Sequence, residues 1–146
     1  MLRSRIAALF GATALLAVLP VAQAHAAATT ADGISMCPSG YACFWANSNY
    51  DSGSSAHMGK VQGDNPDFSA LFSSNILSCG YNWDECISSI ANHGTQCTVY
   101  FYSDHNYGKT HSWHSLSRGD EVSSFASGYN DPNFNDSISS NKWCNS

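Results

Sequence analysis

Charged residues are scarce in this sequence, and basic ones are scarcest. Of its 146 residues only six are Lys or Arg, against eleven Asp or Glu, so the formal net charge is −5. Binding to nucleic acid depends on clustered Lys and Arg that neutralise phosphates. The chain lacks that basic footprint, and we expect no nucleic-acid partner. The acidic balance instead favours solubility and the binding of hard cations.

The sequence motifs of several enzyme classes are also missing. The chain contains no Gly-x-Ser-x-Gly elbow, no His-Glu-x-x-His pair and no glycine-rich phosphate loop. Ser, His and Asp are abundant, but composition does not replace a spaced motif. No Cys-x-x-Cys pair is present, which argues against a structural zinc site. We therefore predict that the protein is not an enzyme.

Long apolar runs are confined to the N-terminus. Two arginines precede an uncharged apolar run over residues 6–21, and small residues follow at 22–24 and 24–26. This order is typical of a signal peptide. The run is interrupted by glycine and proline and is too short for a membrane span of about 20 apolar residues. We predict a signal peptide over residues 1–26, an extracellular protein and no membrane association.

Removal of this leader changes the charge of the chain. About 120 residues remain, enough for one domain. Loss of Arg3 and Arg5 takes the net charge from −5 to −7. The fixed cations that remain are Lys60, Lys109, Arg118 and Lys142. We expect residues 27–36 to form a flexible arm and residues 37–146 to form one monomeric domain.

Cysteine is well represented. All six cysteines follow the leader, at Cys37, Cys43, Cys79, Cys86, Cys97 and Cys144. An even number in an exported chain predicts disulfides, and six cysteines allow 15 pairings between which the sequence does not choose. A turn-forming Pro-Ser-Gly-Tyr-Ala stretch separates Cys37 from Cys43. A local bridge between these two is our first expectation.

Short strands dominate the remainder. No stretch after the leader has a sustained helical period of apolar residues. The segments bounded by turn residues that we predict to be strands are 41–46, 86–92, 97–103, 110–116 and 137–143. Residues 97–103 are the strongest of these because β-branched and aromatic residues favour strands. Many short strands joined by polar turns predict a β sandwich or barrel.

Two polar stretches, residues 51–75 and 117–133, are too long for ordinary hairpin loops. We expect them to contain weak edge strands or to carry function. Within the first, residues 67–72 predict a short helical turn with Asp67 near its start.

The chain contains an internal repeat. The hairpin sequence Trp45-Ala-Asn-Ser-Asn-Tyr50 matches Tyr102-Ser-Asp-His-Asn-Tyr107. Downstream, a first string of residues 84–89 (Asp-Glu-Cys-Ile-Ser-Ser) matches a second string of residues 135–140 (Asn-Asp-Ser-Ile-Ser-Ser). We expect the isoleucine of each string to face the core. One copy alone would expose an apolar face, so we predict that two copies pack around a pseudo-twofold axis.

These repeats resemble the paired Greek-key motifs of the βγ-crystallin superfamily. That superfamily uses an aromatic-x-x-x-x-aromatic-x-Gly hairpin and an Asn/Asp-Asn/Asp-x-x-Ser/Thr-Ser string. The stretches CPSGYACFW, CTVYFYSDHNYGK and FNDSISS resemble more closely one branch of it, the secreted bacterial peptidase inhibitor family thirty-six. The resemblance covers residues 37–144. It implies an all-β, disulfide-stapled sandwich of two Greek-key motifs, with repeats over about 37–93 and 97–144.

Two features depart from the superfamily pattern. The hairpin glycine stands one residue late in the first repeat, at Gly53, and one residue early in the second, at Gly108. This predicts hairpins that contain a bulge or point in a different direction, because glycine marks a position of positive φ. Glu85 stands where Asn or Asp is usual, and its longer side chain would shift any ligand oxygen.

The resemblance also implies a calcium site. In such a site the acidic side chain of one string pairs with the Ser hydroxyl of the other string and with a backbone carbonyl. Carried over residue by residue, the candidate ligands are Glu85 and Ser88 in one half and Asp136 and Ser139 in the other. Oxygen ligands and negative charge suit Ca²⁺. The alternative is structural: these side chains bond the hairpin backbone and bind no ion.

Histidine and tryptophan offer weaker site candidates. His105, His111 and His114 lie within ten residues, but a strand would place the last two on opposite faces. Solvated surface histidines are therefore favoured over a zinc site. Of the four tryptophans, we expect Trp45 to fill the core and Trp83 to be the most exposed.

The resemblance implies that the protein is a secreted peptidase inhibitor with an extracellular protease as its partner. A rigid loop held by disulfides would lose little conformational entropy on entering a protease cleft. Residues 51–65 and 117–133 are the candidate loops by length and polarity. Two alternatives stay open. One is a calcium-binding βγ-crystallin-like module with a structural, stress or antagonistic role outside the cell. The other is a glycan or cell-wall binder that uses exposed Trp.

Overall fold

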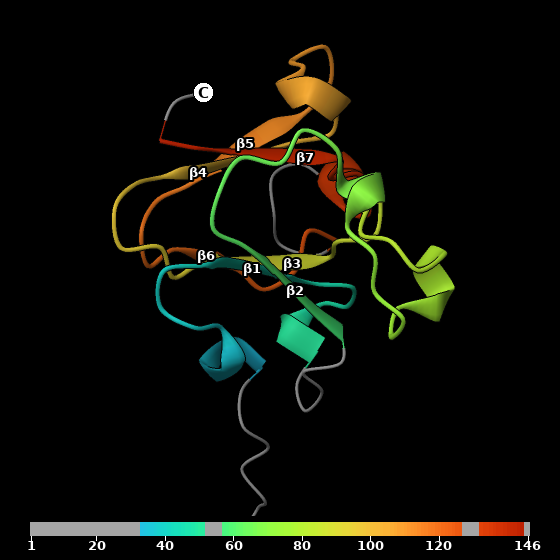
Figure 1. Cartoon of the computed structure of the whole chain (residues 1–146), viewed down its shortest axis with the longest axis horizontal. Coiled ribbons are helices and arrows are strands. Elements are labelled where there is room, and N and C mark those ends of the chain that lie inside the picture. The colour runs from blue at the N-terminus through green and yellow to red at the C-terminus, as the bar shows by residue number, and fades with distance from the viewer. Residues whose placement is uncertain (1–32, 52–56, 127–131, 145–146) are drawn as a thin grey trace, which may run out of the picture.

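The computed structural model describes residues 33–51, 57–126 and 132–144 (Figure 1). The predicted signal peptide and most of the predicted arm lie outside these residues. The strands of the described part are β1 (Ala42–Trp45), β2 (Met58–Val61), β3 (Ser89–Asn92), β4 (Val99–Tyr102), β5 (Trp113–Leu116), β6 (Glu121–Val122) and β7 (Ser140–Trp143). The 3-10 turns are η1 (Gly33–Met36), η2 (Asn49–Asp51), η4 (Phe68–Ala70), η5 (Leu77–Cys79), η6 (His105–Tyr107) and η7 (Pro132–Phe134).

The strands form two antiparallel sheets. The first sheet has the order β2-β1-β3-β6, and the second has the order β5-β4-β7. Figure 1 shows the second sheet above the first, with their faces turned toward each other. This arrangement confirms the predicted all-β sandwich. None of the helical turns in the described residues is long and apolar enough to cross a membrane.

The two halves of the chain exchange backbone partners. Strand β6 comes from the second half but pairs with β3 of the first half, with Ile90 opposite Val122. In return, Asn65 of the first half pairs with Asn141 of β7, and each N–H donates to the other carbonyl at 2.9 Å. Because each half completes the sheet of the other, the halves are interlocked.

Strand β1 is buried on both faces. Ala42 and Phe44 point into the main core between the sheets. Cys43 and Trp45 point the other way, into a second cluster on the outer face of the first sheet. Ile34, in η1, packs against that second cluster. The second cluster therefore covers the outer face of β1.

The predicted strands are all present, although each is shorter than its segment. The strands that composition did not identify, β2 and β6, lie in the two long polar stretches. Strand β2 lacks an apolar pattern partly because Gly59 lies against the ring of Phe44. A Cβ at Gly59 would come within 2.0 Å of that ring. The glycine is needed for close approach of the chain to an aromatic side chain.

The cysteines form three disulfides. The predicted local bridge Cys37–Cys43 is present. Cys79 pairs with Cys86, seven residues away, and Cys97 pairs with Cys144, 47 residues away. The third bridge lies beside the pairing of β4 with β7, where Val99 stands opposite Trp143.

Two local expectations have opposite outcomes. Asp67 caps η4 as predicted, since its carboxylate accepts a hydrogen bond from the Ser69 N–H at 2.8 Å. The expectation that Trp83 is exposed is wrong. Its side chain is buried and meets the Phe44 ring edge-on at 4.9 Å, because the segment after η5 returns to the core at this position. Trp45 is buried as predicted.

Candidate functional site

The two strings lie side by side in a pseudo-symmetric arrangement. The Glu85 N–H donates to the Ile138 carbonyl, and the Asp136 N–H donates to the Ile87 carbonyl, both at 3.1 Å. Ile87 and Ile138 are fully buried in the main core, as predicted. The strings are therefore joined by backbone bonds and anchored by one equivalent side chain each.

Equivalent serines fasten each hairpin to its string. Ser89 Oγ accepts a hydrogen bond from the Tyr50 N–H at 3.2 Å and donates to the carbonyl three residues before that tyrosine at 2.7 Å. Ser140 Oγ accepts from the Tyr107 N–H at 3.2 Å and donates to the equivalent carbonyl at 2.6 Å. The last serine of each string thus has a structural role in the folded hairpin.

Residues with positive φ occur at equivalent positions of the two repeats. Glu85 has φ 51° and Asp136 has φ 52°. In the hairpins, Tyr50 has φ 57° and Tyr107 has φ 61°. Such left-handed backbone is uncommon for residues other than glycine and persists where surrounding contacts hold it. In the second hairpin Gly108 has φ −59°, so positive φ is not the reason for glycine there. A side chain at this position would clash with Asp104, because an added Cβ would lie 2.6 Å from the Asp104 Cβ.

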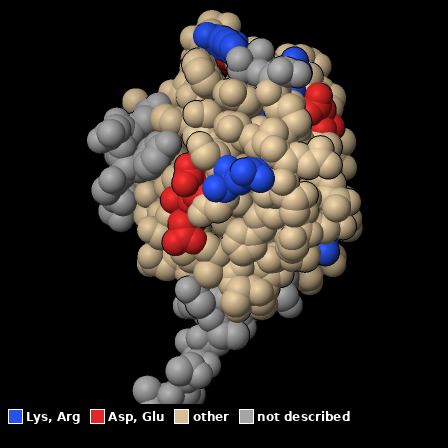
Figure 2. All heavy atoms as spheres, turned by 90° about the vertical axis from the view of Figure 1, so that its left-hand side faces the viewer, with Lys and Arg blue, Asp and Glu red and all other residues tan. Residues whose placement is uncertain are grey.

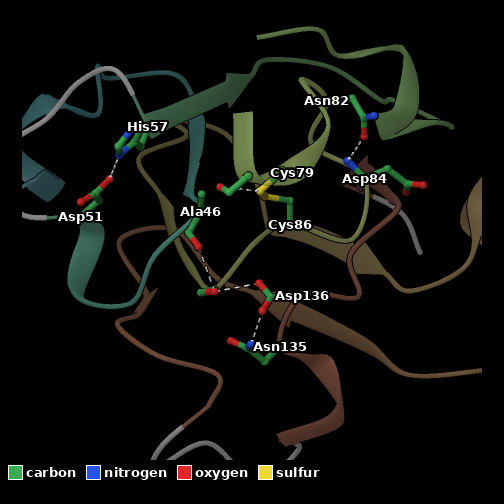
Figure 3. Close-up of a disulfide and its surroundings, with 11 residues drawn as sticks. Ala46, Asp51, His57, Cys79, Asn82, Asp84, Cys86, Asn135 and Asp136 are labelled. Atoms are coloured by element: carbon green, nitrogen blue, oxygen red, sulfur yellow. Dashed lines mark hydrogen bonds and ion pairs between the residues drawn. A yellow bond between two sulfur atoms is a disulfide. The ribbon is translucent and has the colours of Figure 1, made fainter. Parts of the chain in front are cut away.

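Beside the first hairpin, three kinds of oxygen from the two halves converge. Ser88 Oγ donates to Asp136 Oδ1 at 2.8 Å and lies 3.1 Å from the Ala46 carbonyl oxygen. The second carboxylate oxygen of Asp136 accepts a hydrogen bond from the Asn135 side-chain amide at 2.6 Å. Figure 3 shows Ala46 and Asp136 approaching from different elements. The structure thus brings together an acidic side chain of one string and a hydroxyl of the other.

Beside the second hairpin, Glu85 and Ser139 line one depression of about 430 Å³, together with Ser103 and Ser137. Ser103 and Ser137 lie within 3.3 Å of each other through their hydroxyls. Asp104, His105 and His111 also line this depression.

The three histidines of the second repeat do not converge. His105 lies between two carboxylates, with Nδ1 at 3.2 Å from Asp67 and Nε2 at 3.5 Å from Asp84. His111 Nδ1 lies 2.5 Å from Asp104. His114 packs edge-on against the Phe134 ring at 4.4 Å. Within the described ranges, no group of three or more His, Cys, Asp or Glu side chains could hold a metal ion.

Hydrogen bonds from His111 shift the acidity of its partner. The His111 side chain and backbone N–H both bond to the Asp104 carboxylate, and the Thr110 N–H adds a third bond. These bonds, led by the one from the His111 side chain, hold the pKa of Asp104 below its ordinary value. Asp104 therefore stays ionised to a lower pH than an aspartate without these bonds.

An apolar feature was not predicted from the sequence. Phe72, Leu77 and Tyr81 are exposed, although Ile76 between them is buried. The signal that could have located them is a run without charge: residues 71–83 contain no Asp, Glu, Lys, Arg or His. The loops chosen by length and polarity, 51–65 and 117–133, lie partly outside the described residues.

Solved structures similar to this chain include βγ-crystallin domains. A structure from work on the evolution of the eye-lens βγ-crystallin domain fold is 20% identical, with a TM-score of 0.55, over 75% of this chain and 90% of that one. A βγ-crystallin from Ciona intestinalis is 17% identical, with a TM-score of 0.47, over 71% of this chain and 99% of that one. The first likeness confirms the predicted fold.

Sequence comparison identifies the family within that fold. No curated protein sequence matches the chain. The sequence model of peptidase inhibitor family I36, in contrast, matches residues 30–114, which is more than half of the chain. This match agrees with the fold and with the motifs of the two repeats, and the chain belongs to peptidase inhibitor family I36.

Proposed function

We propose that this protein inhibits an extracellular endopeptidase by presenting a rigid segment to the cleft of the enzyme. The observation that carries the proposal is the family match over residues 30–114. An inhibitor of this kind binds and does not catalyse, which agrees with the lack of recognised catalytic motifs in the sequence.

The scaffold suits such a role. Three disulfides and the exchange of strands between the halves restrict motion of the connecting segments. A segment that already has its bound shape loses little conformational entropy in the complex. Disulfides persist in oxidising compartments, which supports action outside the cell.

The surface charge favours a protein partner over a polyanion. Figure 2 shows one face of the molecule, on which charged side chains are few and basic ones form no continuous area. Contact with a protease cleft depends on shape and apolar burial and does not need such an area.

The test is direct measurement of inhibition. The protein without residues 1–26 is incubated at micromolar concentration with chymotrypsin-type, trypsin-type and subtilisin-type serine endopeptidases and with a thermolysin-type zinc endopeptidase. We expect at least one enzyme to be slowed in a saturable, stoichiometric manner. No slowing of any of the four would remove the proposal.

Calcium binding is a second proposed property, supported by the oxygens around Ser88. Asp136, Ser88 and the Ala46 carbonyl would hold one ion beside the first hairpin, and Glu85 and Ser139 would contribute to a second site beside the second hairpin. The donors fit the preference of Ca²⁺ for carboxylate, hydroxyl and carbonyl oxygens. In addition, Asp84 Oδ1 and Asn135 Oδ1, at the first position of each string, are buried and have no hydrogen-bond partner.

Titration calorimetry on chelator-treated protein tests this property. Bound Ca²⁺ would stabilise the folded state, so the melting temperature should rise with millimolar Ca²⁺. The variant Asp136→Ala should lose the site around Ser88, while Lys142→Gln, a control outside the strings, should keep it. Absence of heat and of any melting shift in the unchanged protein would refute calcium binding without affecting the inhibitor proposal.

A further inference from the structure

The large apolar side chains that the described part of the protein exposes are concentrated in one short stretch. Phe72 is 75% exposed, Leu77 67% and Tyr81 42%, and a fourth, Trp113, lies on the opposite sheet. Soluble proteins rarely gather such side chains on the surface unless the area contacts a partner. We name residues 71–83 the apolar projection. In Figure 1 it is the yellow-green segment at the right, which extends away from both sheets.

The apolar projection carries no charge. It has no acidic, basic or histidine side chain, whereas the chain as a whole has 17 Asp, Glu, Lys and Arg residues. The free-energy cost of moving such a surface from water into an apolar pocket is small, because no charged group must be desolvated. The partner area is therefore expected to be apolar.

The projection is held in shape at several points. The Ser73 N–H donates to the Tyr81 carbonyl at 2.8 Å, next to an antiparallel bridge between Phe72 and Asn82. Ile76 is buried in the main core. The Cys79–Cys86 disulfide ties η5 to the first string (Figure 3). The exposed side chains are thus mounted on a fixed backbone.

Phe72 is the side chain best placed to enter a pocket. It is the most exposed of the three, and its ring stacks on Tyr81 with centroids 6.2 Å apart, which limits its motion. It lies in a bridged, strand-like segment, and endopeptidases bind their substrates in extended form. A depression of about 220 Å³ beside it, lined in part by Gly59 and Trp83, gives room for an enzyme rim.

We propose that Phe72 inserts into the apolar specificity pocket of a secreted endopeptidase, with Leu77 and Tyr81 packing on the rim of that pocket. This inference rests on the proposed inhibitory function and names the contact surface within it. It also defines the partner class as an endopeptidase that selects a large apolar side chain.

The experiment compares inhibition constants of variants against the enzyme of the panel that the unchanged protein inhibits best. Phe72→Ala should weaken inhibition at least about 30-fold, because truncation of a central aromatic anchor has an effect of this size. Phe72→Leu should stay within about fivefold, since an apolar pocket tolerates a smaller apolar side chain. Trp113→Ala is the matched control, because Trp113 is as exposed as Tyr81 but lies on β5. It should change inhibition less than threefold.

The outcomes separate the two proposals. If the unchanged protein inhibits and the inhibition constant of Phe72→Ala lies within threefold of its value, the role of the apolar projection is overturned. The inhibitory function is then left intact. Failure of the unchanged protein to inhibit any enzyme overturns both. Sedimentation of the free protein decides whether a second copy covers the projection instead: a dimer that Phe72→Ala dissociates would also overturn the proposal. Unchanged circular dichroism and melting of each variant verify that it is folded.

Discussion

Removal of the Cys97–Cys144 disulfide should lower the free energy of unfolding by about 4 kcal/mol. The bond joins residues 47 apart, with Cα atoms 5.1 Å from each other, and encloses β4, β5, β6 and β7. A cross-link restricts the unfolded chain in proportion to the logarithm of the loop that it closes. For a loop of this length the chain-entropy relation gives about 4 kcal/mol at 25 °C.

The surroundings of this bond isolate the effect of the cross-link. Cys144 is exposed and Cys97 only half-buried, so replacing both by Ser leaves no core cavity. The adjoining backbone contacts do not need the bond: the Cys144 N–H donates to the Thr98 carbonyl at 2.9 Å, and β4 pairs with β7 along four residues. The folded sheet should persist, and the loss should arise in the unfolded chain.

Urea unfolding followed by tryptophan fluorescence measures both parts of this expectation for Cys97→Ser/Cys144→Ser. The free energy of unfolding in water should fall by about 4 kcal/mol, and the m-value should rise because the unfolded chain exposes more surface without the cross-link. A loss below about 1.5 kcal/mol with a native spectrum would refute the reasoning. So would an equal loss with an unchanged m-value, because the effect would then lie in the folded state.

Three further predictions concern a strand glycine, a core position and a titrating contact. Gly59→Ala should lower the free energy of unfolding in urea by about 1–3 kcal/mol, because the added Cβ would meet the Phe44 ring at 2.0 Å. An unchanged free energy would contradict this, because the strand would then move away from the ring without cost. Ile138→Ala should cost about 2–5 kcal/mol in the same assay, since the side chain is fully buried; a loss under 1 kcal/mol, on the order of a surface change, would contradict its place in the core. The lowered pKa of Asp104 means that its interaction with His111 stabilises the fold above the unfolded pKa and is lost as pH falls through the folded pKa. Between pH 5 and pH 2, roughly the range in which carboxyl groups titrate, the melting temperature of Asp104→Asn should therefore fall less than that of the unchanged protein. An equal fall would contradict the role of this pair.

The part of the fold that sequence predicted consists of local patterns. The strand around residues 99–102 was identified because β-branched and aromatic residues favour strands in most contexts. The Cys37–Cys43 bridge followed from a turn only five residues long, and the Asp67 cap followed from side-chain chemistry. The repeat predicted that Ile87 and Ile138 are equivalent core residues. Each of these features depends on residues close together in the chain.

The candidate site was only partly predictable. The string motif identified Ser88 and Asp136, but their contact spans 48 residues and depends on how the two halves pack. The apolar projection was missed because residue type alone does not reveal exposure, and only the fold places Ile76 and Trp83 inside while leaving Phe72 outside.

By itself the sequence determined the strand segments, the two repeats and a disulfide-bonded type of protein, because propensity, spacing and cysteine number act locally. Only the tertiary structure decided the exchange of β6 and Asn65 between the halves, the pairing of Cys97 with Cys144 and the burial of Trp83. Those features are contacts between distant parts of the chain. They are fixed by how two apolar faces fit together, which no local pattern encodes.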